Sequence, residues 1–295
     1  MKETWFVSFN LGQARLPLAR TLLAKAGLTE VAKLAPEGHP LAGLCSITVA
    51  AGDGRVAVLQ DQLARHDVPA TVRLDRHYSD RELEKLPWLQ LIVATAGLMG
   101  GANYRQPYNR EAACPACGAG AVPVGALIAQ LARMGRKHID QTAHDGHLVV
   151  SRTLADALVE AGLTGIALRP VRRDHVPDPD PGFAWLHVVS EWPHMLPTRV
   201  LAVEDLCPAC GRTGHFDPGD RPAEWHYGNV PETAGDFNTT WERFGVWRSR
   251  PRDGDYPPVG GAAGVIVSQR VRQLFKGLGV RGVRYAPVYF NKGAG

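Results

Sequence analysis

The sequence Cys-Pro-Ala-Cys-Gly occurs twice in this chain, at Cys114–Gly118 and again at Cys207–Gly211. A structural zinc ion takes four soft ligands in a tetrahedron, and two thiolates on one tight turn supply half of them. The proline helps to set such a turn, and the glycine permits a positive φ at its end. Two such turns, brought together by the fold, would leave no coordination position open. We therefore expect a structural metal site that joins two distant segments of the chain.

The cysteines of the two motifs define the expected site and its cofactor. The cofactor is one structural zinc ion, and its ligands are Cys114, Cys117, Cys207 and Cys210. A redox-active pair is disfavoured because no apolar helical pattern directly follows either motif. Two separate sites, each completed by histidines, are the alternative, with candidates His138, His144, His147 and His215. The fifth cysteine, Cys45, lies in an apolar run and is expected to be an inert core residue.

A repeated pattern follows the two motifs at a constant offset of 117 residues, as from Ser151 to Ser268. The matching segments are Val150–Leu154 with Val267–Val271, Gly162–Ile166 with Gly279–Val283, and Pro170–Val171 with Pro287–Val288. In each copy an apolar strand ends at a serine that can cap a helix, and glycines follow the helix. The pattern predicts two strand–helix–strand units, each after a CPACG motif. Such units are common, so a chance match is the alternative.

The first hundred residues alternate between strand-like and helical patterns. Trp5–Phe9, Cys45–Ala50 and Trp88–Thr95 are apolar runs typical of strands. Apolar residues at helical spacing predict helices over Leu16–Ala26 and Val56–His66. Strands and helices that alternate at this pitch are typical of a small α/β sandwich.

The predicted fold class is α+β. An N-terminal α/β sandwich precedes two repeated strand–helix–strand units, which a four-cysteine zinc-ribbon-like site joins. We place a βαβαβ-like domain at residues 1–110, the first CPACG with its unit at 111–175, and the second at 183–295. The turn-rich stretch His175–Gly182 separates the two units, which together would form one zinc-stapled domain. Residues 212–262 are rich in Gly, Pro and Asp, and we expect long loops there.

Composition excludes several classes of protein. Of the 295 residues, 45% are hydrophobic and 21% are charged, which argues against a disordered chain. The formal net charge of +4 is too small to imply nucleic-acid binding by itself. The chain opens on an apolar strand pattern, so we expect no secretory signal, and no apolar run reaches the length of a membrane span. We expect a cytoplasmic protein that does not enter the membrane.

Histidines supply the remaining candidates for a metal or catalytic site. The sequence His144–His147 precedes an apolar strand pattern, so we expect a hairpin turn there, with a metal or catalytic role as the alternative. His187 and His194 lie beside Trp185 and Trp192, and we expect them to pack against a hydrophobic face. The sequence contains no recognised nucleophile elbow, zinc-protease motif or phosphate-binding loop.

The stretch Arg243–Arg252 interleaves arginines with aromatic residues, which is typical of surfaces that stack on bases and contact phosphates. A zinc-ribbon nucleic-acid binder is therefore an alternative function. The competing interpretation is a loop whose aromatic rings dock on a sheet while its arginines stay solvated. Aromatic and arginine side chains also dominate protein interfaces. The candidate partner-binding residues are Trp241, Phe244, Trp247 and Arg248.

The two motifs and the closing pattern V-S-x-x-h…G-h-x-G-h…P-V resemble the double-CxxCG-motif proteins of myxobacteria. The resemblance covers about Ala113 to Tyr289. Some members of that family are classed as immunity proteins, which neutralise a cognate toxin delivered by kin cells. This chain departs from the family's pattern because a hundred-residue region precedes its first motif and because it carries the closing pattern twice. The resemblance implies a zinc-binding, non-enzymatic protein that binds a toxin or another protein.

Overall fold

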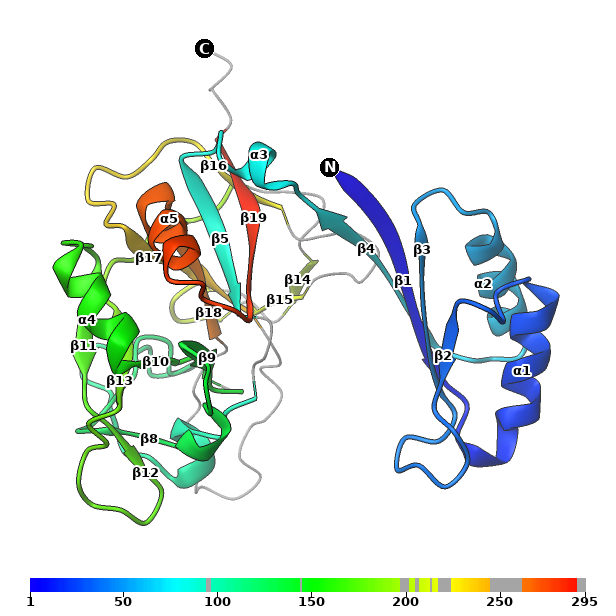
Figure 1. The fold of residues 1–295 in the computed structure, drawn as a ribbon, viewed down its shortest axis with the longest axis horizontal. Helices are drawn as coiled ribbons and strands as arrows, with labels where there is room; N and C mark the ends of the chain where they lie inside the picture. The colour runs from blue at the N-terminus through cyan, green and yellow to red at the C-terminus, as the bar shows by residue number, and fades with distance from the viewer. Residues whose placement is uncertain are drawn as a thin grey trace. The chain divides into compact units, whose positions relative to one another are not determined.

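The computed structural model divides the chain into two compact units, the first spanning Met1–Ser79 and the second beginning at Asp80 (Figure 1). The structure describes residues 1–93, 97–143, 145–196, 202–204, 207–212, 214–216, 224–244 and 262–290. Both units mix strands and helices, which confirms the predicted α+β class. Among the described residues, no helix has both the length and the apolar character needed to cross a membrane.

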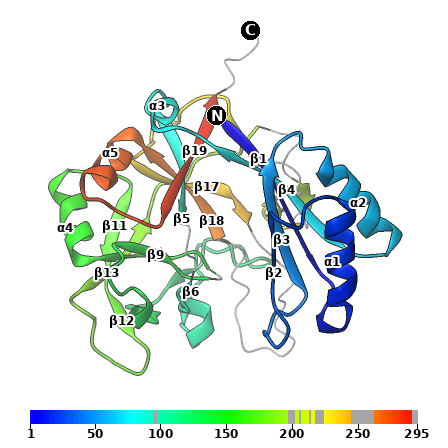
Figure 2. The same ribbon diagram turned by 45° about the vertical axis from the view of Figure 1, so that its right-hand side comes forward.

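The first unit is a four-stranded antiparallel sheet in the order β2-β3-β1-β4. Its elements are β1 (Lys2–Asn10), η1 (Gln13–Arg15), α1 (Leu16–Lys25), β2 (Ala32–Leu34), β3 (Leu44–Ala50), α2 (Arg55–Arg65) and β4 (Ala70–His77). Figure 2 shows α1 and α2 on the same face of this sheet. In α2 the buried residues Val56, Leu59 and Leu63 recur at helical spacing, so one face of the helix packs on the strands. Cys45 on β3 is fully buried in this core, as the sequence predicts.

The second unit contains a seven-stranded mixed sheet in the order β14-β15-β17-β18-β5-β19-β16. Its strands are β5 (Trp88–Val93), β14 (Ala202–Glu204), β15 (Gly214–Phe216), β16 (Trp225–Tyr227), β17 (Phe237–Phe244), β18 (Ala262–Ser268) and β19 (Val283–Phe290). The helices α3 (Asp80–Leu83) and α5 (Gln269–Gly277) accompany it. Near its centre, β5 pairs antiparallel with both β18 and β19.

A second sheet of the same unit has the order β11-β13-β10-β9, with antiparallel neighbours. Its elements are β9 (Ile139–Gln141), β10 (Leu148–Ser151), α4 (Arg152–Glu160), β11 (Ile166–Arg169) and β13 (Phe183–Val188). Shorter elements complete the described part: η2 (Gly101–Tyr104), β6 (Tyr108–Asn109), β7 (Val122–Pro123), β8 (Leu127–Ala129), η3 (Leu131–Arg133) and β12 (Val171–Arg173). β6 pairs with β7, and β8 pairs with β12.

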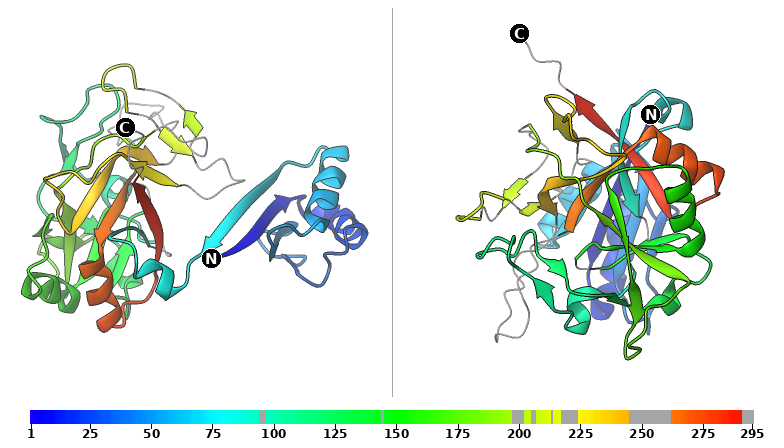
Figure 3. Two further views of the ribbon diagram at one scale, coloured as in Figure 1. Left: turned by 90° about the horizontal axis from the view of Figure 1, so that it is seen from above. Right: turned by 90° about the vertical axis from the view of Figure 1, so that its left-hand side faces the viewer.

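Both repeated segments form a strand, a helix and a second strand: β10-α4-β11 and β18-α5-β19. In each unit a third strand, antiparallel to both, lies between the two strands: β13 in the first and β5 in the second. The central strands come from different places along the chain, so the predicted duplication stays a prediction. The two helices lie next to each other (Figure 3), and the Arg270 guanidinium of α5 donates to the carbonyl of Ala161 after α4 at 2.8 Å.

The two repeated segments differ in how their helices are capped. The N–H of Leu154 donates to Ser151 Oγ at the start of α4, as the repeat predicts. At the start of α5, Ser268 Oγ instead donates to Asp236 at 2.7 Å, and no side-chain cap forms. The serine thus keeps its position but exchanges a local cap for a tertiary hydrogen bond.

Two expectations need correction. Residues 88–95 were expected in the N-terminal domain, but β5 lies within the seven-stranded sheet, so the second unit begins near residue 80, not near 110. The alternation of strands and helices does not reveal which sheet an apolar strand joins. Residues 212–262 were expected to be long loops, yet Phe237–Phe244 forms the eight-residue strand β17. Its buried polar residues, such as Asn238 and Glu242, obscure the apolar alternation of a strand.

Candidate metal centre and adjacent pocket

The two CPACG motifs fold into the same turn. In each, the N–H of the first cysteine, Cys114 or Cys207, donates to the carbonyl five residues later at 2.9 Å. The glycine four residues after that cysteine donates back to its carbonyl, at 2.8 Å in the first motif and 2.9 Å in the second. Gly118 and Gly211 have φ values of 70° and 71°, a backbone region that residues with a Cβ rarely adopt. The motif's glycine is therefore needed to complete the turn.

The four motif cysteines lie together in one cluster. The Sγ atoms are 3.7 Å apart between Cys114 and Cys207 and 3.6 Å apart between Cys117 and Cys210. All four sulfur atoms lie within 4.8 Å of one another. A tetrahedron with metal–sulfur bonds of about 2.3 Å has edges of about 3.8 Å, so the spacing fits one metal ion. Among the described residues, no histidine or carboxylate joins this group.

The surroundings shift the pKa values of the cluster's thiols in opposite directions. Backbone N–H groups, that of Cys117 first, lower the pKa of the Cys114 thiol to about 6, whereas burial raises the pKa of Cys117. Two guanidinium groups interact electrostatically with the cluster, those of Arg212 and Arg243. Glu191 forms ion pairs with both, at 2.8 Å and 3.1 Å. Positive charge therefore lies close to thiols that would carry negative charge as metal ligands.

The histidines proposed as alternative ligands lie elsewhere where their side chains are described. His138 contacts the hydroxyl of Ser151 at 3.0 Å, and His147 lines the pocket described below. The placements of His144 and of the His215 side chain lie outside the described residues.

The candidate partner-binding aromatics are packed within the second unit. Trp241 on β17 lies 3.5 Å from His194 between ring centroids, and the Arg212 guanidinium lies 5.0 Å from the Trp241 ring. Phe244 stacks on Trp225 at 5.4 Å. Both rings therefore dock on neighbouring residues, as the competing interpretation of this stretch describes. Trp247 and Arg248 lie outside the described residues.

Arg243 differs from both interpretations of its stretch, because it is only 8% exposed. Its guanidinium donates to the carbonyl of Thr240 at 2.9 Å and pairs with Glu191. An arginine held in this way does not offer its donors to a phosphate. The expectation of a solvated arginine at this position was therefore wrong, and residues 245–252 of the basic stretch lie outside the described part.

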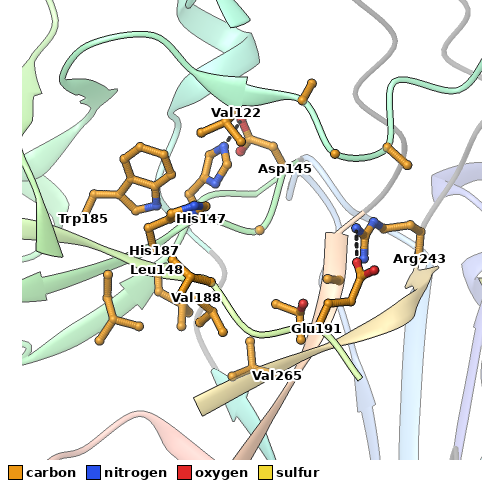
Figure 4. Close-up of a pocket in the computed structure, with 18 of the residues that line it drawn as sticks. Val122, Asp145, His147, Leu148, Trp185, His187, Val188, Glu191, Arg243 and Val265 are labelled. Atoms are coloured by element: carbon orange, nitrogen blue, oxygen red, sulfur yellow. Dashed lines mark hydrogen bonds and ion pairs between the residues drawn. The ribbon is translucent and has the colours of Figure 1, made fainter. Parts of the chain in front are cut away.

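A pocket of about 320 Å³ lies beside the first cysteine motif (Figure 4). Residues 118–122, which begin at the glycine of the motif, form one wall, and residues 145–148 and 185–189 form others, together with Thr239, Ala263 and Val265. The Glu191–Arg243 ion pair also lines the pocket. Polar side chains from residues 145–147, 187–191 and 239–243 thus converge on one concave surface of the second unit, which is the usual form of a ligand-binding site.

A buried carboxylate holds one of the pocket histidines. The carboxylate of Asp145, whose side chain is inaccessible to solvent, accepts hydrogen bonds from the hydroxyls of Tyr108 and Thr142, each at 2.5 Å. Its Oδ2 lies 3.5 Å from His147 Nε2, and the backbone N–H of His147 donates to Thr142 Oγ1 at 2.8 Å. A Cβ at Gly101, where φ is +51°, would collide with this carboxylate. The position of His147 is therefore fixed by the carboxylate of Asp145 and by the hydroxyl of Thr142.

His187 on β13 is the second histidine of the pocket. The ring centroid of Trp185 lies 5.1 Å from that of His147 and 4.8 Å from that of His187. Burial lowers the pKa of both imidazoles, that of His187 to about 4, so both are neutral at pH 7. The structure confirms the predicted hairpin between β9 and β10 and the predicted packing of His187. The sequence did not indicate that these two histidines share a pocket, because strand register brings them together.

Comparison with known proteins adds no family to this description: no protein-family model matches the chain, and no curated protein matches it. The fold and the cluster define a mixed α+β protein with a four-cysteine site compatible with a metal ion.

Proposed function

We propose that the four motif cysteines hold one zinc ion in a closed, structural site. The observation that carries this proposal is the spacing of the sulfur atoms, 3.6 Å and 3.7 Å across the two motifs. Zinc in structural sites is bound tetrahedrally, with four thiolates as one of the common ligand sets. Because the protein would fill all four positions, such an ion has no place for a substrate or a reactive water.

The charge of the surroundings supports the same proposal. A zinc ion with four thiolates carries a net charge of about −2, and a charge of that size needs compensation when it is partly buried. The guanidinium groups of Arg212 and Arg243 lie near the cluster and supply positive charge. The ion would join two turns that are 93 residues apart in sequence.

Metal analysis of the purified full chain tests the zinc site. We expect one zinc per chain, and we expect only one thiol, that of Cys45, to lie outside the metal site. The matched control is Cys45→Ala, because this cysteine is buried in the first unit and should leave the zinc content unchanged. A metal-free protein, or zinc that is retained when Cys117 is replaced by serine, would contradict the proposal.

We further propose that the protein acts by binding a protein partner, in the manner of immunity proteins that neutralise a toxin. Support comes from the resemblance to the double-CxxCG-motif proteins and from a metal site whose geometry suits a structural role. Trp247 and Arg248 are the preferred contact residues. Trp241 and Phe244 also serve the packing of the second unit, so their replacement would disturb folding as well as binding.

Affinity purification of the tagged chain from its native cells, followed by mass spectrometry, tests the partner proposal. We expect one stoichiometric protein that is toxic when expressed alone and harmless when co-expressed with this chain. Arg248→Ala should weaken the complex, whereas the control Arg65→Ala, which changes an exposed arginine of the first unit, should not. Protection that needs no complex, or co-purified nucleic acid in place of a protein, would overturn the proposal.

A further inference from the structure

The pocket beside the cysteine motif contains two histidines: His187 on β13, and His147, the residue just before the adjacent strand β10. Strands β10 and β13 pair with Leu148 opposite Leu186. One residue beyond that pair, the register places His147 opposite His187. Side chains directly opposite each other on antiparallel strands have Cβ atoms about 4.5–5.5 Å apart, and both imidazoles line the same pocket. Two imidazoles at this separation can reach one ion, because metal–nitrogen bonds are about 2.0 Å long.

We propose that His147 and His187 form a second metal site, which binds a transition-metal ion such as Zn²⁺ through both imidazoles and leaves its other coordination positions open to the pocket. Figure 4 shows both histidines on one side of the pocket, next to Trp185 and across from the Glu191–Arg243 ion pair. Imidazole ligands suit zinc, copper, nickel and iron, whereas magnesium and calcium take oxygen ligands. The proposal is independent of the partner-binding function proposed above.

The groups behind His147 are those that metal-binding histidines commonly have. A histidine that binds a metal through one ring nitrogen usually presents the other to a carboxylate, a carbonyl or water. Here Nε2 of His147 faces Asp145 at 3.5 Å and the Tyr108 hydroxyl at 3.4 Å, which leaves Nδ1 for the metal. The hydroxyls of Tyr108 and Thr142 hold the carboxylate in turn.

The nitrogens proposed as ligands are not engaged elsewhere in the described part of the chain. Within it, neither Nδ1 of His147 nor either ring nitrogen of His187 makes a hydrogen bond to another residue. A packing role would account for the contacts of both rings with Trp185, but it does not require a carboxylate behind one ring and an open pocket in front. The pocket supplies room for water or a further ligand on the ion.

Calorimetric titration of Zn²⁺ into the full chain that already carries one zinc tests the second site. We expect one further binding event, weakened about tenfold or more in His147→Asn and in His187→Asn and absent in the double variant. The matched control is His175→Asn, because the His175 side chain is 92% exposed and lies outside the pocket. No further event, or an event that persists in the double variant, would overturn the proposal.

A measurement on the unchanged protein removes the risk that a variant misfolds. We expect the side-chain ¹⁵N resonances of His147 and His187 to shift when the second equivalent of Zn²⁺ is added, and that of His175 to stay in place. Shifts confined to other histidines would overturn the proposal. The zinc content of the unchanged, purified chain reports on the cysteine site, whereas the titration of further Zn²⁺ reports on the histidine site, so failure of the cysteine site and failure of the histidine site give different results.

Discussion

The cysteine cluster and the histidine pocket are neighbours in the second unit, yet different forces hold their side chains in place. Each cysteine pair lies on its own five-residue turn, which two backbone hydrogen bonds and one glycine complete. The pocket histidines depend on strand register and on a carboxylate fixed by hydroxyls from β6 and β9–β10. The conformation of each CPACG turn depends mainly on the residues within it. The positions of the pocket histidines can be altered by a substitution far from either histidine.

The largest expected effect comes from the cluster. Cys117→Ser removes one of four ligands, and structural zinc contributes an apparent binding free energy of about 10–16 kcal/mol, as much as the whole stability of many domains. We expect the second unit to unfold or aggregate at room temperature, as measured by circular dichroism and hydrogen exchange. The first unit should keep its own unfolding transition, because its core contains none of the four cysteines.

The control for Cys117→Ser is a substitution that should affect the first unit and not the second. Cys45→Ala should destabilise the first unit by about 1–3 kcal/mol, since it leaves a small cavity in a closely packed core, and should leave the second unit unchanged. An unaltered melting temperature in Cys117→Ser would show that the cluster does not stabilise the fold.

An intermediate effect is expected at Gly101, which lies against the carboxylate of Asp145. Gly101→Ala adds left-handed strain of about 1–2 kcal/mol and a collision with Asp145 that costs about 1–3 kcal/mol more. We expect lower stability in urea and weaker binding of the second zinc, with the first zinc retained.

A matched glycine separates strain from collision. Gly135 has a φ of 50°, close to the 51° of Gly101, but a Cβ there would meet no atom within 4 Å. Gly135→Ala should therefore show the strain alone and leave the binding of both zinc ions unchanged. Equal losses of stability in the two variants would mean that the carboxylate moves aside easily and does not fix His147.

The smallest expected effect is a pH dependence. Burial lowers the pKa of His187 to about 4, so the folded protein keeps this imidazole neutral while the unfolded chain protonates it near pH 6.5. The contribution to stability is present above pH 6.5 and is lost as the pH falls towards 4. Because the side chain is partly exposed, the loss should be less than the roughly 3 kcal/mol that the full shift corresponds to.

Urea unfolding at pH 7 and pH 4.5 measures this dependence. The loss on acidification should be smaller in His187→Asn than in the unchanged protein. Acid also protonates the cysteine ligands in both proteins, so only the difference between the two reports on His187. Identical losses would show that His187 is not held in a neutral state by burial.

The same contrast explains what the sequence could predict. The cysteine cluster was predictable because the spacing and turn chemistry of CPACG are written within five residues, twice. The helices α1 and α2 and the strands of both repeated segments were likewise indicated by local periodicity. Pairing of His147 with His187 depends on how β10 aligns with β13, which no local pattern specifies.

Buried polar residues were the second feature that limited prediction from the sequence. β17 carries Asn238, Thr240 and Glu242 on buried positions, so its sequence does not show the apolar alternation of a strand. Arg243 on the same strand is buried because Glu191 and a carbonyl satisfy its donors, and Glu191 comes from a segment about fifty residues earlier. Such compensation depends on tertiary contacts, so the sequence predicted a solvent-exposed arginine at a position where the structure has a buried one.

The separation of the two CPACG turns also has a consequence for the order of events during synthesis. Ribosomes add about 5–20 residues per second, so the second turn emerges roughly 5–20 seconds after the first, given the 93 residues between Cys114 and Cys207. During that interval the nascent chain presents two thiols without their partners. The segment β10-α4-β11 is complete before the second pair exists, so any folding of this segment in that interval takes place beside an open half-site.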